Sequence, residues 1–264
     1  MKINRINKIQ EMLQETNSAS IDQLCDIFNV SKNTIRRDIA ELQTRGIIKK
    51  VYGGITMNQS AASPEPFASR EIKNSAQKKK IARLAAKTVR NGDVIYIDSG
   101  TTTMHMIPFL TEKINLTILT ASMHVINAAS NYSQINTIAT GGSLYIPSKT
   151  FVGPSVIQCL GHYNISKIFL SSTGISIENG ATNASPLECE VKRFLMKKTA
   201  AKYLLVDTSK IDKASLMTYC QLKDLNYVVM DTQPPKEYLT YFKENNVQLI
   251  TEETTLTLDK APLY

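Results

Sequence analysis

Apolar and polar positions alternate along the first 44 residues with the spacing of three short helices. In residues 5–16 an apolar side chain recurs every three or four positions, which places one set on a single helical face: Ile6, Ile9 and Leu13. Ser20 and Gln23 stand three positions apart, as in a capping box, and predict the start of a second helix. The apolar positions of that second helix are Leu24, Ile27 and Phe28.

A third helix is predicted after a short break, with Ser31 as its N-cap and Gly46 as its C-terminal stop. Its buried stripe consists of Ile35, Ile39 and Leu42. Residues 47–56 then combine β-forming side chains with a Gly-Gly pair, which predicts a small wing. Two helices joined by a tight turn form a helix-turn-helix, in which the second helix enters the major groove of DNA. Residues 1–56 are therefore predicted to be a winged helix-turn-helix DNA-binding domain.

The candidate contacts to double-stranded operator DNA are polar side chains at the start of the third helix and on the wing: Ser31, Lys32, Asn33, Thr34, Arg36, Arg37, Lys49 and Lys50. Arginine and lysine can reach the acceptors of guanine, and asparagine can pair with adenine. Some of these side chains are expected to hold phosphates instead, which sets the register without reading the sequence. The alternative is a three-helix packing module whose charges are solvated.

A second, larger domain is predicted after a linker. Residues 57–69 are small, polar and proline-bearing, with no periodicity, and form the predicted linker. In residues 70–264 helical and strand patterns alternate, beginning with a basic helix over about 70–90 that buries Ile72 and Ile81 among others. Apolar runs predict strands at 94–98, 116–120, 135–140, 167–172, 203–207 and 227–231. This alternation predicts an α/β domain with a mostly parallel sheet covered on both faces.

Glycines, hydroxyls, acids and a lysine follow the predicted strands, at residues 98–103, 140–142, 171–174 and 207–210. In a parallel α/β sheet, ligands bind beyond the carboxyl ends of the strands. Gly100 would allow close backbone approach, and the N–H groups of residues 101–103 would open a helix whose dipole favours an anion. Asp98 could accept hydrogen bonds from sugar hydroxyls and Lys210 could supply a countercharge. A sugar phosphate site is therefore predicted, with a plain strand-to-helix turn as the alternative. The Walker pattern G-x-x-x-x-G-K-[ST] is absent, which argues against a nucleoside triphosphate.

Composition excludes several other classes of protein. The chain has 264 residues, of which 42% are hydrophobic, an ordinary value for a soluble protein with a core. No apolar run approaches the roughly 18 residues that a membrane helix needs, and the N-terminus lacks an apolar signal stretch, so we expect a cytoplasmic protein that does not bind membranes. The cysteines are far apart and form no C-x-x-C pair, so neither zinc nor a disulfide framework is indicated. We expect neither a metal nor a cofactor.

The net charge of +8 is concentrated in the N-terminal third of the chain. Residues 1–56 carry +3 and residues 70–90 carry +7, whereas residues 91–264 carry −1. A basic excess next to a predicted helix-turn-helix suits a polyanionic partner such as DNA.

The motifs of the smaller domain closely resemble a known family. V-S-K-N-T-I-R-R-D-I-A-E-L at residues 30–42, followed by G-I-I-K-K-V-Y-G-G at residues 46–54, resembles the N-terminal signature of the DeoR family of bacterial transcriptional repressors. The larger domain is similar to the family's C-terminal sensor domain in several segments that occur in the same order: Arg70, K-K-K-I-A, I-D-S-G-T-T, Gly141-Gly142, F-x-x-x-T-G, E-C-E-V-K and D-T-S-K.

The resemblance implies that the larger domain has a fold similar to sugar-phosphate isomerases and binds a phosphorylated sugar that releases the repressor from DNA. It implies an effector site made of Asp98, Ser99, Gly100, Thr101, Thr102, Gly142, Gly174, Glu188, Lys192 and Lys210. Within the family, the motifs are most similar to repressors of myo-inositol catabolism, which implies a phosphorylated keto-acid inducer. The chain departs from the family where it reads Thr120-Ala121-Ser122, since many members read T-N-S there.

Two other functions are compatible with the larger domain. Carboxylates at Asp98, Glu188, Glu190 and Asp207, with Lys210, could serve a sugar-phosphate isomerase that carries a DNA-binding domain. The domain could also be an oligomerisation body, although that role would not require the polar strand ends. The helix-turn-helix favours a repressor without catalytic activity. Because half-site spacing mirrors protein symmetry, we expect a homodimer or homotetramer.

Overall fold

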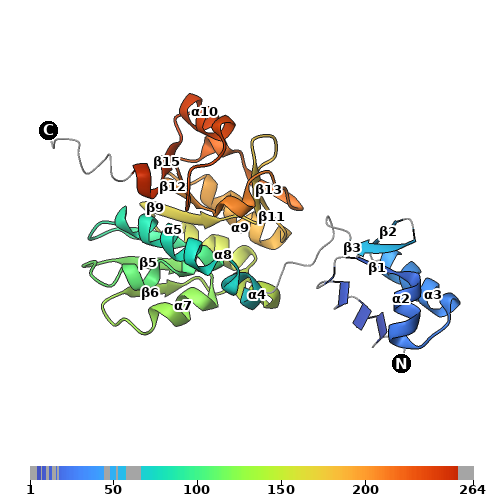
Figure 1. Cartoon of the computed structure of the whole chain (residues 1–264). Helices are drawn as coiled ribbons and strands as arrows, with labels where there is room; N and C mark the ends of the chain where they lie inside the picture. Colours follow the sequence, from blue (N-terminus) through green and yellow to red (C-terminus); the bar gives the residue numbers. More distant parts are fainter. Residues whose placement is uncertain are drawn as a thin grey trace. The chain divides into compact units, whose positions relative to one another are not determined.

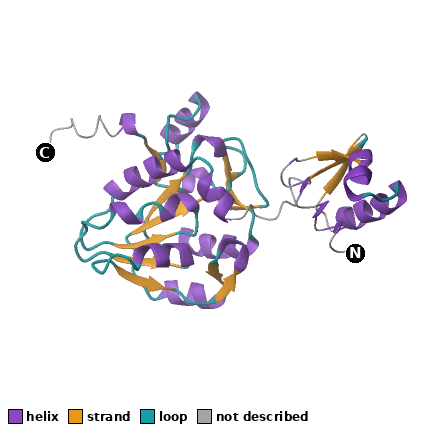
Figure 2. Cartoon of the chain, turned by 60° about the horizontal axis from the view of Figure 1, so that its bottom comes forward, coloured by secondary structure: helices purple, strands orange, loops and turns teal. Residues whose placement is uncertain are grey.

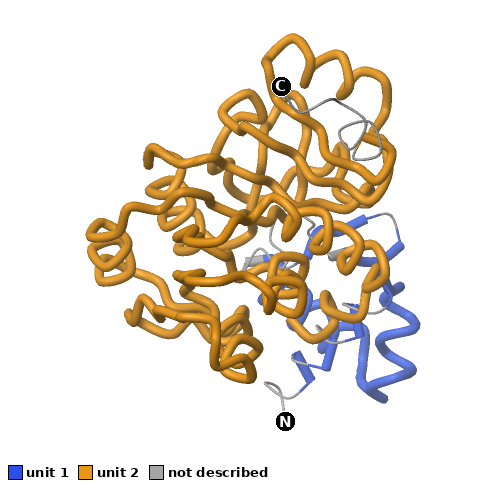
Figure 3. Tube along the Cα trace, turned by 90° about the vertical axis from the view of Figure 1, so that its left-hand side faces the viewer, with its two compact units in different colours: residues 1–63 blue, residues 64–264 orange. Residues whose placement is uncertain are grey.

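The computed structural model describes residues 5, 6, 8, 9, 12, 13, 16, 18–44, 48–51, 53–57 and 67–254. The chain divides into two compact units, residues 1–63 (unit 1) and residues 64–264 (unit 2), coloured separately in Figure 3. No helix in the described part of the chain has the length and apolar character needed to cross a bilayer.

Unit 1 has the predicted winged helix-turn-helix fold. Its elements are β1 (Ser18–Ser20), α2 (Ile21–Phe28), α3 (Lys32–Thr44), β2 (Ile48–Val51) and β3 (Gly54–Met57). The strands form an antiparallel sheet in the order β1-β3-β2, in which the hairpin of β2 and β3 is the wing. The predicted capping box is present, because the Ser20 hydroxyl accepts from the Gln23 N–H and the Gln23 side chain accepts from the Ser20 N–H. The predicted stop at Gly46 lies outside the described residues.

The core of unit 1 follows the predicted stripes with one exception. Its buried side chains include Ile6, Ile9, Leu13, Leu24, Ile35, Ile39 and Leu42. Ile27, one of the apolar positions of α2, is 60% exposed. The guanidinium of Arg5 pairs with Asp38 at 2.6 Å, and Asp38 is buried. This ion pair ties the segment before β1 to the recognition helix α3.

Unit 2 is built on a seven-stranded sheet in which every neighbouring pair is parallel. The strands are β4 (Val94–Ile97), β5 (Thr117–Thr120), β6 (Asn136–Ala139), β9 (Lys167–Ser171), β12 (Ala201–Leu205), β14 (Tyr227–Val229) and β15 (Gln248–Ile250). Their order across the sheet is β15-β14-β12-β9-β4-β5-β6. The first six strands along the chain were predicted. The edge strand β15 was not, since it is only three residues long and only partly buried.

Helices cover both faces of this sheet, as predicted (Figures 1 and 2). The helices of unit 2 are α4 (Phe67–Ile72), α5 (Ser75–Lys87), α6 (Thr101–Met104), α7 (Met123–Ala129), α8 (Pro154–Gly161), α9 (Pro186–Met196) and α10 (Lys236–Glu244). Successive strand residues point to opposite faces. Ile95 and Ile97 of β4 therefore pack in one core with α5 and α7, whereas Tyr96 packs in the other with α8, α9 and α10.

Shorter elements complete unit 2. They are the hairpin β7 (Ser143–Tyr145) and β8 (Thr150–Val152), the antiparallel sheet of β10 (Gly174–Ser176), β11 (Gly180–Asn183) and β13 (Met217–Cys220), and the 3-10 helices η1 (Ile107–Phe109), η2 (Ile146–Ser148), η3 (Thr208–Lys210) and η4 (Leu222–Asp224). None of these strands has an apolar run or an alternation long enough to mark it in the sequence.

The predicted helix over 70–90 is wrong in one respect, because it is two helices. The chain breaks at Asn74, which has a φ of +55° and joins α4 to α5. Ile72, predicted to be buried, is 80% exposed. Asparagine tolerates the left-handed region, and its side-chain NH₂ donates to Asp207 Oδ1 and Ser209 Oγ, both at 3.1 Å. These long-range contacts outweigh the local helical preference of the segment.

Candidate effector site and DNA-binding surface

The candidate effector site lies at the point where the strand order of the sheet reverses. From the interior strand β4 the chain builds β5 and β6 on one side, and then returns to build β9, β12, β14 and β15 on the other. Ligands of open α/β sheets bind beyond the strand ends at such a switch point. Here the switch lies between β4, which is followed by Asp98, and β9, which ends with Ser171.

Asp98 is the centre of a buried polar cluster at this point. Its Oδ2 lies 2.8 Å from Lys192 Nζ and accepts hydrogen bonds from the N–H and hydroxyl of Ser171, at 2.9 and 2.6 Å. Both charged side chains are only 4% exposed. Burial acts to raise the pKa of Asp98, but the charge and hydrogen bond of Lys192 and the two donors of Ser171 outweigh it, so the pKa lies below its ordinary value. The carboxylate is therefore ionised at neutral pH.

Lys192 is also fixed by two further groups. Its ammonium donates to the carbonyl of Ser171 at 2.7 Å and lies 5.0 Å from the centre of the Tyr219 ring. The Tyr219 hydroxyl donates to the same carbonyl at 3.0 Å. Burial raises the pKa of Tyr219 well above its ordinary value, so the phenol stays neutral. The sequence did not point to Tyr219, because β13 is short and Tyr219 lies 27 positions from Lys192.

Helix α9 brings Glu188 and Lys192 to the cluster. The helix starts at its N-cap Ser185, whose hydroxyl accepts from the Glu188 N–H. Glu188 and Lys192 are four positions apart and hence on one helical face. Glu188 Oε1 accepts from the Ser99 hydroxyl at 2.9 Å. The structure thus joins Asp98 to Lys192 and Ser99 to Glu188, which were all proposed for the site from sequence.

Gly100 has a packing role in addition to the predicted one, which nothing in the structure tests. A Cβ at this position would lie 2.4 Å from Ser171 Cβ and 2.2 Å from Ser171 Oγ. Its φ of −73° is one that any residue adopts. The space left by the missing side chain is therefore used by Ser171, which can approach close enough to bond Asp98. Thr101 and Thr102 follow at the start of α6 and are buried, while the Thr103 hydroxyl bonds the Asp98 and Gly100 carbonyls.

Replacing Gly100 with alanine is expected to destabilise unit 2 by about 2–4 kcal/mol, because the new methyl group must displace Ser171 and break its bonds to Asp98. Calorimetric unfolding of the full chain measures the loss. Gly161→Ala is the matched control, since a Cβ there meets nothing within 4 Å at the end of α8. A Gly100→Ala protein as stable as the Gly161→Ala protein would contradict this role of Gly100.

The remaining candidate effector residues lie around the same edge of the sheet. Gly142 follows β6, two strands from β4, and Gly174 begins β10, three residues after Ser171. Both are tightly packed, since a Cβ would meet Val156 Cγ2 at 2.8 Å in the first case and the Lys213 carbonyl at 2.3 Å in the second. Lys210 ends η3, in the loop after β12, the neighbour of β9.

The loop that departs from the family pattern is fastened to the hairpin beside it. Ala121 is buried, and its carbonyl accepts from the Phe151 N–H at 2.7 Å and from the Thr150 hydroxyl at 3.0 Å. The Thr120 hydroxyl donates to the Ile97 carbonyl, and Ser122 caps α7. This loop therefore offers backbone rigidity to the site, and its alanine offers no polar side chain.

The candidate DNA contacts at the start of α3 and on the wing are solvent-exposed, except Thr34, which is half-buried. Ser31 caps the helix, because its hydroxyl accepts from the Thr34 N–H and bonds the Thr34 hydroxyl. Lys32 pairs with Asp22 of α2 at 2.6 Å, an exposed contact that orients the lysine. The other exposed basic and amide side chains are Asn33, Arg36, Arg37, Lys49 and Lys50. Those on α3, Asn33, Arg36 and Arg37, lie off the stripe that packs in the core.

Family models match both units. The DeoR-like helix-turn-helix domain matches residues 5–61, and the DeoR C terminal sensor domain matches residues 73–232. The HTH-type transcriptional regulator IolR of Bacillus subtilis (strain 168) is 40% identical over 247 residues, which cover 94% of this chain and 98% of that protein. YulB of the same organism, an uncharacterized HTH-type transcriptional regulator, is 33% identical over 228 residues, with 86% and 88% coverage.

Among solved structures, ribose 5-phosphate isomerase A from Methanocaldococcus jannaschii aligns with 53% of this chain and 55% of its own, at 19% identity and a TM-score of 0.40. That similarity is too remote to inform function. The two family matches and the relative that spans nearly the whole chain are decisive, and they confirm the family predicted from the sequence motifs: the chain belongs to the DeoR family of transcriptional regulators.

Proposed function

We propose that this protein is a transcriptional repressor of a carbohydrate catabolic operon. It binds operator DNA in the cytoplasm through α3 and the wing, as a homodimer or homotetramer, and a phosphorylated sugar or sugar acid releases it. The observation that carries the proposal is the Asp98–Lys192–Ser171 cluster at the switch point of the sensor sheet, in the same chain as a DeoR-type helix-turn-helix. The similarity to repressors of myo-inositol catabolism favours a phosphorylated keto acid as inducer.

The cluster supports binding of a polar, anionic ligand beside it. The backbone N–H groups at the start of α6 and the hydroxyls of Thr101 and Thr102 are the candidate phosphate donors, with Lys210 as countercharge. Within the described residues, the contacts of the Asp98 carboxylate all fall on Oδ2, which leaves Oδ1 to accept from a sugar hydroxyl. Glu188 similarly uses Oε1 for Ser99, and Oε2 can accept from the ligand.

The same geometry favours sensing over catalysis. A general base for isomerisation works best with a pKa near neutral pH, but the pKa of Asp98 is lowered. Asp207 is also engaged, since its Oδ1 accepts from Asn74 and from the Ser209 N–H at 3.0 Å. Lys192 is held by Asp98, by a carbonyl and by an aromatic face. The ionisable groups thus hold one another in place, and we infer that the protein is not an enzyme.

Helix α4 provides a route from this site to the DNA-binding unit. It is the first described element of unit 2, and the Phe67 ring stacks on His124 of α7 with the ring centres 3.5 Å apart. Burial lowers the pKa of His124, so the stacked ring is neutral at pH 7. Directly after α4, Asn74 bonds the loop after β12. A ligand that moves the loop after β12 would therefore move the segment that leads to unit 1, with a coupling of about 1–3 kcal/mol.

The proposal is tested by melting the full-length protein with a panel of phosphorylated sugars and phosphorylated keto acids. A true effector at 100 times its dissociation constant is expected to add about 2.7 kcal/mol of stability and to weaken operator binding by about 5–150-fold. Thr102→Val, which keeps the side-chain shape, should reduce both effects, whereas Thr111→Val beyond η1 should not. If no compound in the panel stabilises the protein or releases it from DNA, the proposed effector class is wrong.

A further inference from the structure

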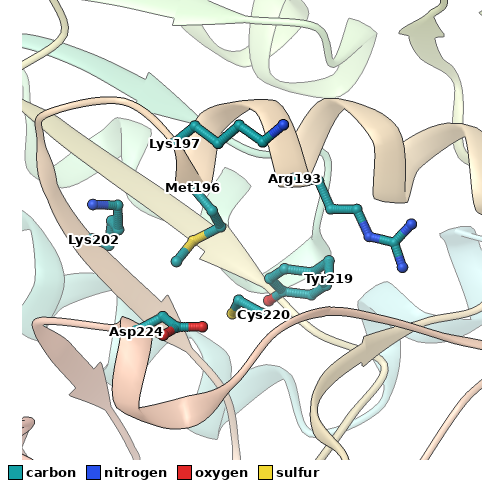
Figure 4. A pocket seen from close by; sticks show the side chains of 7 residues that line it. All are labelled: Arg193, Met196, Lys197, Lys202, Tyr219, Cys220 and Asp224. Carbon is teal, nitrogen blue, oxygen red and sulfur yellow. The ribbon is translucent and has the colours of Figure 1, made fainter.

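A second polar pocket lies at the opposite end of strand β12 from the candidate effector site. It has a volume of about 530 Å³, is open to solvent and is lined by residues of α9, β12, β13 and η4 and by Lys197 just after α9 (Figure 4). Lys202, the second residue of β12, lines it, whereas Asp207 follows the carboxyl end of the same strand. At about 3.3 Å per residue along a strand, the two positions are roughly 16 Å apart. A ligand in this pocket would therefore be separate from one at the candidate effector site.

The charge of the pocket is predominantly positive. Arg193, Lys197 and Lys202 line it, against one acid, Asp224. Asp224 is occupied as a cap, because its Oδ2 accepts from the Gln221 N–H at 2.9 Å. Arg193 donates to the Thr218 carbonyl. In the part of the chain that the structure describes, no acidic side chain lies within ion-pair distance of the Lys197 or Lys202 ammonium group. Two ammonium groups are thus available for an anion, whereas Figure 4 shows the Arg193 guanidinium on the far side of the pocket from Lys202.

The remaining walls of the pocket are neutral. Figure 4 shows Met196, Cys220 and Tyr219 between Lys202 on one side and Arg193 on the other. Burial raises the pKa of the Cys220 thiol to about 12 and that of Tyr219 well above its ordinary value. Neither group is ionised at neutral pH, so neither repels an anion. The thioether and the aromatic ring offer an apolar surface next to the cations.

We propose that this pocket is a second ligand site, which binds a small phosphate monoester whose phosphate is held by the Lys197 and Lys202 side chains and whose carbon body packs on Met196 and Tyr219. The site goes beyond the proposed function, because it does not include any residue of the candidate effector site. Tyr219 nevertheless connects the two sites. Its hydroxyl donates to the Ser171 carbonyl, which also accepts from Lys192. A ligand on the Tyr219 ring therefore acts on the group that positions Lys192.

The test uses 4-fluorophenyl phosphate as the probe and ¹⁹F NMR titration of the full-length protein. Saturable binding is expected, and Lys197→Gln with Lys202→Gln should weaken it by about tenfold or more, because two charge-assisted contacts to the phosphate are lost. Lys236→Gln with Lys243→Gln removes the same charge from the exposed face of α10 and should change the affinity less than about twofold. 4-Fluorophenol, which lacks the phosphate, should bind far more weakly.

The other outcomes overturn the proposal. An equal loss in the α10 double variant would mean that the probe responds only to overall charge. Unchanged binding in the Lys197/Lys202 variant, together with loss in Thr102→Val, would mean that the probe occupies the candidate effector site alone. Absence of saturable binding at millimolar probe would show that the pocket holds no phosphate monoester. None of these results affects the test of the proposed function, which depends on operator release and on Thr102.

Discussion

Lys192→Met is expected to destabilise unit 2 by about 3–5 kcal/mol, which is the cost of leaving one member of a buried ion pair without its partner. Asp98 would remain at the switch point with only the two donors of Ser171, and the Ser171 carbonyl would lose one of its two donors. Calorimetric unfolding of the full-length protein measures the change in the transition of unit 2. Since the chain has no tryptophan, calorimetry is preferable to intrinsic tryptophan fluorescence.

Two controls define the origin of this loss. Lys80→Met removes a lysine from a partly exposed pair with Glu252 and is expected to leave the transition almost unchanged. Asp98→Asn with Lys192→Met removes both charges and should recover part of the stability, because no uncompensated charge remains. If Lys192→Met unfolds at the same temperature as Lys80→Met, the cluster does not stabilise the sensor domain and its geometry serves the ligand alone.

The Asp98–Lys192 pair also determines the direction in which the stability of the wild-type protein changes with pH. The pKa of Asp98 is lower in the folded state than its ordinary value of 3.8, so the unfolded chain binds the proton first as the pH falls. The contribution of the pair is therefore fully present above about pH 4 and is lost as the pH falls through the folded pKa. In Lys192→Met the lysine no longer opposes the effect of burial on Asp98, so the folded-state pKa of Asp98 should rise. The loss of stability that accompanies protonation of Asp98 should then occur at higher pH.

Local signals in the sequence were sufficient for the helix-turn-helix and for most of the central sheet. The capping box of α2 and the apolar stripe of α3 depend on residues within a few positions of one another, and both were predicted. The six predicted strands are apolar runs that a parallel sheet buries on both faces. The polar residues directly after those runs indicated which edge of the sheet carries the candidate site, but the strand order, and with it the switch point, was not predicted.

Contacts between distant segments account for what the sequence did not reveal. Gly100 is constrained by Ser171, 71 positions away, so its role in admitting that side chain could not be distinguished from a role in phosphate approach. The break at Asn74 depends on Asp207 and Ser209, more than 130 positions away. Tyr219 lies on a strand of four residues without an apolar run. In each case the decisive neighbour becomes visible only after the chain folds.

Arg36→Ala is expected to weaken binding to operator DNA by about 5–150-fold, the range for loss of one bidentate contact to a base. Arg36 is exposed on α3, away from the buried stripe, so the variant should fold normally and keep its stabilisation by the effector. The DNA is first selected from random sequences by the wild-type protein. Binding is then measured by fluorescence-anisotropy titration, on the selected DNA and on a non-selected DNA. Lys87→Ala, at the end of α5 in unit 2, is a control for loss of one exposed positive charge.

The comparison between the two DNAs decides what Arg36 does. A base contact predicts a loss on selected DNA that is much larger than the loss on non-selected DNA, and Arg36→Lys should recover little of it, because lysine lacks the planar fork. Loss of a phosphate contact predicts equal losses of affinity on both DNAs, and a dependence of log affinity on log salt whose slope is reduced by about one. We expect this second behaviour for Lys49→Ala on the wing. If the Arg36→Ala and Lys87→Ala proteins bind both DNAs with the same affinity, Arg36 is not part of the DNA-binding surface. The assignment of α3 as the recognition helix would then be wrong.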